Sequence, residues 1–310
     1  MRRVLITGVS GFVGSSLRET LQSLLMEVYG FDLRADAYDS HVFAGEITDN
    51  AVILDALRQV QPDIIFHLAG ILKSQRADDL YSVNVLGTVA LFEAITESGL
   101  RPRVIVASSS AVYGAGVGGR PIAESFQLRP VTHYAASKLA QEMVALRYFT
   151  AFDMPVICIR TFNLLGPGLS PGMAPSAFAK QIAEAEKTGK PTRIFTGNLS
   201  AQRDYVDVRD AVRAYALIAE HGKAGQIYNV CSGRAISMAE ILQILLDQAK
   251  VPIEAVLDPD RVQKQDVPVQ IGSAKKIQQL TGWKPEIDVK QSLVDLLNDW
   301  REKINKESNL

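Results

Sequence analysis

A short apolar strand that runs directly into a glycine-rich turn constrains this chain more than any other feature. Residues 3–7 are mainly apolar, and Gly8, Gly11 and Gly14 follow at intervals of three. A helical pattern then covers 13–25. Glycines at these places permit a tight turn and a close approach of a diphosphate to the backbone, and the helix start supplies N–H donors and a positive dipole. The turn therefore predicts a dinucleotide-binding site.

Short apolar runs alternate with longer helical patterns through the first half of the chain. Strands are expected at 3–7, 27–32, 63–68, 103–107 and 156–160, and helices at 13–25, 50–60, 80–98 and 134–152. Apolar strands that alternate with helices indicate a parallel sheet with right-handed crossover connections on both faces. The expected fold class is therefore α/β, a doubly wound parallel sheet.

The second half of the chain has a different residue pattern. A Gly- and Pro-rich loop covers 165–175, after which helices are expected at 176–188, from about 208 and at 238–249, and strands at 192–195 and 228–231. The chain has 310 residues, which exceeds the usual size of one core, so a second, smaller lobe is expected. The polar tail after about Arg301 is expected to fray.

The interleaving of elements predicts that this smaller α/β lobe is discontinuous. The dinucleotide-binding domain is expected to span 1–163, with a later return around 205–232. Residues 164–204 and 233–310 are expected to form mainly the substrate-binding lobe.

Charge and cysteine content exclude several classes of partner. Lys and Arg number 33 against 34 Asp and Glu, without a basic cluster, which argues against a nucleic-acid or anionic-membrane partner. The N-terminus enters a strand, and apolar runs stay short of a membrane helix, so the cytoplasm is the expected location. Cys158 and Cys231 stand alone in apolar runs and are expected to be buried and reduced. No metal site is expected, because His67 and His133 have no third ligand in sight.

Two residues near the end of the second strand argue in opposite directions about the cofactor. Asp32 would accept hydrogen bonds from ribose hydroxyls, which favours NAD. Arg34 would meet a 2′-phosphate, which favours NADP. The sequence slightly favours NAD and leaves NADP open.

A tyrosine, a lysine and a group of serines suggest proton-transfer chemistry. Tyr134 and Lys138 lie one turn apart on the expected helix, where an ammonium and an oxidised nicotinamide would lower the pKa of the phenol. A serine run, 108–110, ends an expected strand and offers a hydroxyl for the substrate oxygen. Each feature alone also has a purely structural explanation: the tyrosine and lysine as a chance pair on a helix, and the serines as a turn that caps a helix.

Six motifs together resemble the extended short-chain dehydrogenase/reductases, in their nucleotide-sugar epimerase and dehydratase branch. The motifs are TGVSGFVG, HLAG, SSSAVYG, YAASK, RTFNLLGPG and RDYVDVRD. The resemblance implies a Rossmann-type sheet, with Ser109 as catalytic hydroxyl, Tyr134 as acid/base and Lys138 as its electrostatic partner. Ser110 competes for the serine role and otherwise contacts substrate. Asn84 resembles an asparagine that props the active site, and plain helix packing explains it almost as well.

The same resemblance implies a set of residues that hold the dinucleotide. They are Gly8, Ser10, Gly11, Phe12, Val13, Gly14, Asp32, Arg34, Glu46, Ile47, Leu68, Ala69, Gly70, Asn84, Tyr134 and Lys138.

The residues that follow the catalytic serine narrow the reaction. Dehydratases of this branch carry acidic residues there, whereas this chain has Ser110 and Ala111, so dehydration is disfavoured. A cysteine typical of epimerases that act on ring carbons through an enol is also missing beside Ser109. A simple 4-ketoreductase and a 4-epimerase remain.

The C-terminal half favours the reductase. Its motifs resemble the reductases that convert GDP-4-keto-6-deoxy-D-mannose to GDP-D-rhamnose with NADH or NADPH. The alternatives are a nucleotide-sugar 4-epimerase that retains tightly bound NAD, and a non-catalytic nucleotide sensor on the same fold. A homodimer through the helices at 80–98 and 134–152 is also implied.

The resemblance assigns the diphosphate of the nucleotide sugar to Asn163, Arg203 and Arg261. A surface ion pair with a neighbouring aspartate is the alternative for Arg203. The chain departs from the reductase pattern at Gln263, where an arginine is usual, and Arg261 and Lys264 flank that position. It also has Leu164 and Leu165 in place of a more polar pair, so the resemblance leaves the sugar and the base open.

Overall fold

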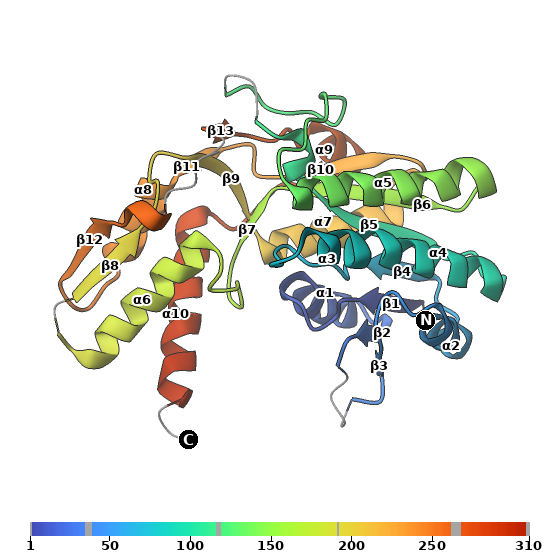
Figure 1. The fold of residues 1–310 in the computed structure, drawn as a ribbon, viewed down its shortest axis with the longest axis horizontal. Helices are drawn as coiled ribbons and strands as arrows, with labels where there is room; N and C mark the ends of the chain where they lie inside the picture. The colour runs from blue at the N-terminus through green and yellow to red at the C-terminus, as the bar shows by residue number, and fades with distance from the viewer. Residues whose placement is uncertain (1, 35–38, 116–118, 191, 262–267, 308–310) are drawn as a thin grey trace.

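Seven parallel strands form the central sheet of the computed structural model, which describes residues 2–34, 39–115, 119–190, 192–261 and 268–307 (Figure 1). The strands are β1 (Arg3–Thr7), β2 (Glu27–Asp32), β3 (Val42–Ala44), β4 (Ile64–His67), β5 (Arg103–Ser109), β6 (Val156–Thr161) and β10 (Ile227–Val230). Their order is β10-β6-β5-β4-β1-β2-β3, so the direction of winding reverses between β1 and β4. The expected doubly wound Rossmann-type fold is confirmed, and this reversal marks where such sheets bind ligands.

Side chains of the central strands alternate between two apolar layers, because successive residues of a strand point to opposite faces. On β1, Val4 and Ile6 pack into one layer and Leu5 into the other. The helices α1 (Phe12–Ser23) and α7 (Val208–His221) cover the first layer. The helices α2 (Asn50–Val60), α4 (Gly87–Ser98) and α5 (His133–Phe152) cover the second.

The helix expected at 80–98 is not regular. It consists of α3 (Ala77–Tyr81), a π-helical segment (Ser82–Leu86) and α4. The prediction of one uniform helix is therefore wrong, since local sequence preference does not register an extra residue in a turn. Such π segments occur frequently at functional sites. This one carries the buried Asn84.

The second lobe has its own small sheets. Strands β7 (Asn163–Leu165), β9 (Gln202–Asp207), β11 (Ala235–Ser237) and β13 (Val269–Gln270) form one sheet, and β8 (Thr192–Thr196) pairs with β12 (Ile253–Leu257) in another. The helices α6 (Ala174–Thr188), α8 (Met238–Leu246) and α10 (Val289–Glu307) share a third apolar core. Helix α9 (Lys275–Thr281) lies against α7 and β10.

Helix α10 corrects the expectation that the tail frays after Arg301. The helix runs on to Glu307, and Ile304 is only 6% exposed. Trp300 donates from Nε1 to Ser176 Oγ at 2.9 Å. The tail is polar in composition, but Trp300 and Ile304 lie one turn apart and pack into the core that α10 shares with α6 and α8.

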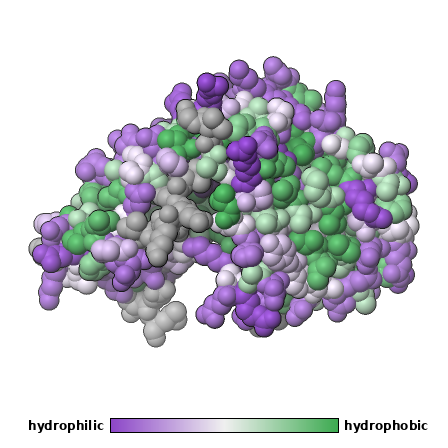
Figure 2. Space-filling model, turned by 45° about the horizontal axis from the view of Figure 1, so that its top comes forward, coloured by the Kyte–Doolittle hydropathy of each residue, from purple (hydrophilic) through white to green (hydrophobic). Residues whose placement is uncertain are grey.

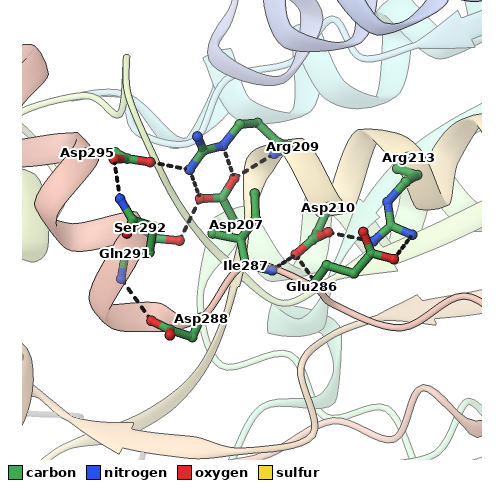
Figure 3. Close-up of polar contacts among 10 residues, drawn as sticks. All are labelled: Asp207, Arg209, Asp210, Arg213, Glu286, Ile287, Asp288, Gln291, Ser292 and Asp295. Atoms are coloured by element: carbon green, nitrogen blue, oxygen red, sulfur yellow. Dashed lines mark hydrogen bonds and ion pairs between the residues drawn. The ribbon is translucent and has the colours of Figure 1, made fainter.

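Three buried carboxylates in RDYVDVRD bind segments that return from later in the chain. Asp204 accepts hydrogen bonds from backbone N–H groups of 232–233 and 272. Asp207 accepts from Arg209 and from Ser292 Oγ on α10. Asp210 accepts from the backbone N–H groups of 286–287 at 2.8 and 2.9 Å (Figure 3). Residues three positions apart thus each bind a different returning segment.

The described residues include two free cysteines and neither a cluster of metal-ligating side chains nor a membrane-spanning helix. Cys158 and Cys231 are free and buried. Within the described ranges, no group of three His, Cys, Asp or Glu side chains is arranged to hold a metal ion. No helix among those same residues is long and apolar enough to cross a membrane.

Candidate active site

The predicted site residues gather at the carboxyl ends of the central strands. The glycine turn follows β1, Asp32 ends β2, the segment 68–70 follows β4, and Ser109 ends β5. Parallel strands bring their carboxyl ends to one edge of the sheet, so residues far apart in sequence meet there. The edge lies beside the reversal between β1 and β4.

The glycine turn is too tight for side chains. Gly8 has a φ of +75°, and a Cβ there would lie 2.8 Å from the backbone nitrogen of Ala69. A Cβ on Gly14 would lie 2.1 Å from the Gly8 carbonyl oxygen. Gly11 is the N-cap of α1 and has no side chain to bind the first N–H groups of that helix. Those donors suit an anion, so this cradle fits the pyrophosphate of a dinucleotide.

The residues that would face the adenosine ribose lie beside this turn. Asp32 accepts from the backbone N–H of Ser10 at 2.9 Å and of Leu33 at 2.8 Å. Arg34 is exposed two residues further on. The structure therefore ties the Asp32 carboxylate to the turn and leaves Arg34 at the surface.

The neighbouring cofactor candidates frame the same edge. Glu46 is exposed and Ile47 is buried, both just after β3. Phe12 and Val13 are half-buried in the first turn of α1. Phe12 packs against the core of the first lobe and also against the core of the second.

Asn84 connects the loop after β4 to α5. Its Oδ1 accepts from the backbone N–H of Ile71 at 2.8 Å, and its Nδ2 donates to Ser137 Oγ at 2.9 Å. A Cβ on Gly70 would lie 2.8 Å from that Oδ1, so the loop passes directly over the amide. Asn84 is fully buried and holds the 68–70 loop in place.

Ser109 and Tyr134 come together across the edge of the sheet. Thr132 caps α5 by accepting from the backbone N–H of Ala135 at 3.1 Å, which fixes where Tyr134 begins the helix. Burial raises the pKa of Tyr134, and a hydrogen bond from the Ser109 hydroxyl opposes this rise. The opposing effect was expected from Lys138 and here comes from Ser109.

Lys138 is buried behind Tyr134 on the same helix. Its Nζ donates to the carbonyl of Ala107 and to Oε1 of Gln141. Burial lowers the pKa of Lys138 to about 8, although the charge of Glu142 acts in the opposite direction. The ammonium form therefore dominates at neutral pH.

Ser110, the other serine candidate, is engaged elsewhere. It is 5% exposed, and its Oγ donates to Gln270 Oε1 at 3.3 Å. Gln270 donates from Nε2 to the carbonyls of Ser110 and Gly114. A residue of the second lobe thus braces the turn that carries Ser109.

The residues assigned to the diphosphate lie on the second lobe. Asn163 donates from Nδ2 to the Asp204 carbonyl at 3.1 Å, and Arg203 donates to the Gln202 carbonyl at 2.8 Å. Arg261 ends a short helical turn, Pro259–Arg261. The Arg261 side chain, Gln263 and Lys264 lie outside what the structure describes.

Sequence reasoning missed a buried ion pair behind the site. Arg160 donates to both carboxylate oxygens of Glu142, at 2.9 and 2.7 Å, and their side chains are 2% and 0% exposed. Ser108 also donates to Glu142, and Arg160 donates to the Tyr113 hydroxyl. Two signals were available: Arg160 follows four buried strand residues, and Glu142 lies one turn after Lys138.

Comparisons with known proteins agree with this geometry. The sequence profile of the NAD dependent epimerase/dehydratase family matches residues 4–231. A GDP-6-deoxy-D-mannose reductase from Pseudomonas aeruginosa is 33% identical over 99% of both chains. A UDP-glucose 4-epimerase from Mycolicibacterium smegmatis is 30% identical over 97% of this chain and 99% of that protein.

A solved structure supports the same assignment. RMD from Pseudomonas aeruginosa complexed with NADPH superposes with a TM-score of 0.86 at 32% identity, over 97% of this chain and 100% of that one. The chain therefore belongs to the NAD-dependent epimerase/dehydratase family and is an NAD(P)-dependent enzyme of the extended short-chain dehydrogenase/reductase type.

Proposed function

We propose that the chain reduces the C4 keto group of a nucleotide-linked 4-keto-6-deoxyhexose, with GDP-4-keto-6-deoxy-D-mannose as substrate and GDP-D-rhamnose as product. The observation that carries the proposal is the pairing of Ser109 with Tyr134 without an ionisable side chain at 110 or 111. Such a site suits proton transfer to an oxygen and does not suit removal of a proton from the sugar ring. The GDP-6-deoxy-D-mannose reductase relative supports the same substrate class.

The chain's own residues supply the proton and hold the reacting oxygen. The reduced nicotinamide, when bound, supplies the hydride. Ser109 donates a hydrogen bond to the C4 oxygen, and Tyr134 gives its phenol proton to that oxygen. Because burial raises the pKa of Tyr134, the phenol stays protonated at neutral pH, as an acid in the reductive direction must. The Lys138 ammonium stabilises the phenolate that remains.

The two lobes bind different ligands. Residues 1–163 and 205–232 hold the dinucleotide, and 164–204 and 233–310 hold most of the nucleotide sugar. Arg203 and Arg261 bind its diphosphate, since guanidinium groups match phosphate oxygens, and the Asn163 amide adds an N–H donor. Ser110 shapes the sugar pocket through its contact with Gln270.

A substrate assay decides the reaction. GDP-4-keto-6-deoxymannose with NADPH or NADH should consume one reduced cofactor per sugar, followed at 340 nm and by product chromatography. A panel of UDP- and dTDP-linked 4-keto sugars serves as the specificity control. If none of these sugars consumes reduced cofactor, the reductase proposal is wrong.

The 4-epimerase remains the second candidate, because a UDP-glucose 4-epimerase is 30% identical to the chain. An epimerase would purify with tightly bound NAD and interconvert nucleotide sugars without added reductant. Freely exchanging cofactor together with stoichiometric oxidation would exclude it.

We expect Asp32 to set the cofactor preference, with a slight advantage for NAD. Asp32→Asn keeps an oxygen for the Ser10 N–H and removes the charge that repels a 2′-phosphate. The ratio of kcat/KM for NADPH over NADH should then rise about tenfold. Arg34→Ala should lower the same ratio. Glu19→Gln, a charge removal at an exposed position of α1, is the control, and an equal change in that variant would contradict the role of Asp32.

Exposed apolar side chains on the predicted dimer helices support a homodimer. Leu86, Met143 and Phe152 are 58%, 50% and 46% exposed, in the π segment before α4 and on α5. Figure 2 shows hydrophobic surface gathered on the right, the side on which Figure 1 places α4 and α5. Light scattering should give twice the chain mass for the protein and one chain mass for Leu86→Asp/Met143→Lys. A monomeric parent protein would contradict the proposal.

The proposed location is the cytoplasm. The buried free thiols Cys158 and Cys231 suit a reducing compartment, and so does a supply of reduced nicotinamide.

A further inference from the structure

Lys138 is held from inside the protein by two oxygen atoms. Its Nζ donates to the carbonyl of Ala107, at the end of β5, and to Oε1 of Gln141 on α5. Lys138 is 6% exposed and Gln141 is fully buried. An ammonium has three N–H donors, so these two contacts leave one donor for whatever binds in the site.

The amide of Gln141 can face Lys138 in only one way. Its Nε2 donates to Thr88 Oγ1 at 3.0 Å. The Thr88 hydroxyl uses its own proton to donate to the Asn84 carbonyl at 2.7 Å, so it can only accept from Gln141. The nitrogen of the amide therefore points to Thr88, and the oxygen is left for the ammonium.

Further hydrogen bonds connect Thr88 to the dinucleotide turn. Thr88 Oγ1 also accepts from Nε2 of His67, 2.9 Å away, which places the single ring proton of His67 on Nε2. The Nδ1 of His67 then accepts from Thr7 Oγ1 at 2.8 Å, and Thr7 Oγ1 accepts from the backbone N–H of Ala69 at 3.2 Å. Burial, followed by the charge of Lys138, lowers the pKa of His67 to about 3, so the ring stays neutral. In this hydrogen-bond network, the two threonine hydroxyls and the His67 ring N–H each donate to one acceptor.

We infer that Gln141 is a positioning residue for Lys138. The hydrogen-bonded residues Gln141, Thr88, His67 and Thr7 hold the amide oxygen of Gln141 against the Lys138 ammonium. They also connect Gln141 to the loop at Ala69, beside Gly8. A neutral acceptor holds the ammonium without cancelling its charge at Tyr134. The inference rests on the proposed function only in placing Lys138 at the site of proton transfer.

The other ionisable groups around Lys138 leave room for this role. Glu142 raises the pKa of Lys138, but its carboxylate is shared between Arg160 and Ser108. Cys158 on β6 also contributes to the pKa of Lys138, and its own pKa is raised by burial, so the thiol is neutral. His67 is neutral as well. Gln141 is thus a neutral side chain that fixes the direction of one Nζ–H bond of Lys138.

The titration of Lys138 itself tests the inference without substrate. Protein labelled with ¹³C at lysine Cε is titrated by NMR, and the Lys138→Arg variant identifies the signal. Gln141→Leu removes an acceptor from the charged form, so the midpoint should fall by about one unit. Gln141→Glu adds a carboxylate beside the ammonium, so the midpoint should rise by about one unit or more. Thr88→Val frees the amide and should lower the midpoint by a smaller amount.

Kinetics then show whether the position matters for catalysis. With a working substrate, the basic limb of the kcat profile should move down in pH in Gln141→Leu and up in Gln141→Glu, with KM nearly unchanged. Ser176→Ala, which removes a fully buried hydrogen bond far from the site, is the matched control and should move neither quantity.

The outcomes separate this inference from the proposed reaction. A shifted Lys138 titration in the absence of any turnover supports the inference and rejects only the choice of substrate. Gln141 and Thr88 variants that titrate as the parent protein does would overturn it, as would an equal shift in Ser176→Ala. If the Gln141 variants fail to fold, Thr88→Val alone decides, because it leaves Gln141 in place.

Discussion

Tyr134→Phe is expected to lower kcat by about 10³-fold, within the range of a lost general acid. The Tyr134 phenol is an ionisable group in hydrogen-bond contact with Ser109. Phe keeps the ring and its packing, so the fold and the affinity for the cofactor should stay close to those of the parent protein. Stopped-flow oxidation of NADPH and a cofactor titration measure the two quantities separately.

Tyr148→Phe is the matched control, because it makes the same change on the same helix about four turns further along. Tyr148 is 7% exposed and stacks on Phe92 at a centroid distance of 4.7 Å, so loss of its hydroxyl should leave kcat within about twofold. A Tyr134→Phe variant that keeps more than a tenth of the rate would reject the acid role. A non-catalytic nucleotide sensor would respond to nucleotide sugar equally well with and without the phenol, so the same variant tests that alternative.

The second large effect concerns stability and lies in the Glu142–Arg160 pair. Glu142→Leu should lower the free energy of unfolding by about 3–5 kcal/mol, because it leaves the Arg160 guanidinium charged and buried without its partner. Arg160→Met should cost a similar amount for the reciprocal reason. The side chains are 0% and 2% exposed, so water cannot compensate either charge. Urea unfolding followed by circular dichroism gives these free energies.

The double variant Glu142→Leu/Arg160→Met should recover most of the loss, since neither charge then remains buried. Glu254→Ala breaks a pair of the same chemistry at the surface, where Arg193 and Glu254 are 69% and 63% exposed, and should cost less than about 1 kcal/mol. Single variants no less stable than this surface control would show that the buried pair carries no special weight.

The fold was predictable because its signals are local. The run 3–7 and the strands at 27–32 and 156–160 are apolar at their inner positions, and only a sheet covered on both faces buries such runs completely. Errors arose where the decisive contact was distant. The tail after Arg301 looked polar, yet Ile304 and Trp300 pack into the core that α10 shares with α6 and α8.

The site was predictable in part for the same reason. Ser109, Tyr134 and Lys138 stand in motifs whose residue types and spacing indicate their chemistry. The acidic residues of RDYVDVRD were harder to interpret. From the sequence, Asp204 or Asp207 was the alternative ion-pair partner of Arg203, whereas Asp204 accepts from backbone N–H groups of segments 28 to 68 residues away.

Strand polarity, backbone freedom and side-chain chemistry are properties of neighbouring residues, so the parallel sheet, the glycine turn and the proposed proton-transfer residues could be predicted from the sequence. The pairing of Ser109 rather than Ser110 with Tyr134, the ion pair of Arg160 with Glu142 and the orientation of the Gln141 amide arise only in the folded chain. These outcomes depend on hydrogen-bond partners up to 160 residues apart, such as Ser110 and Gln270. A buried donor or acceptor takes whatever partner the folded chain brings to it.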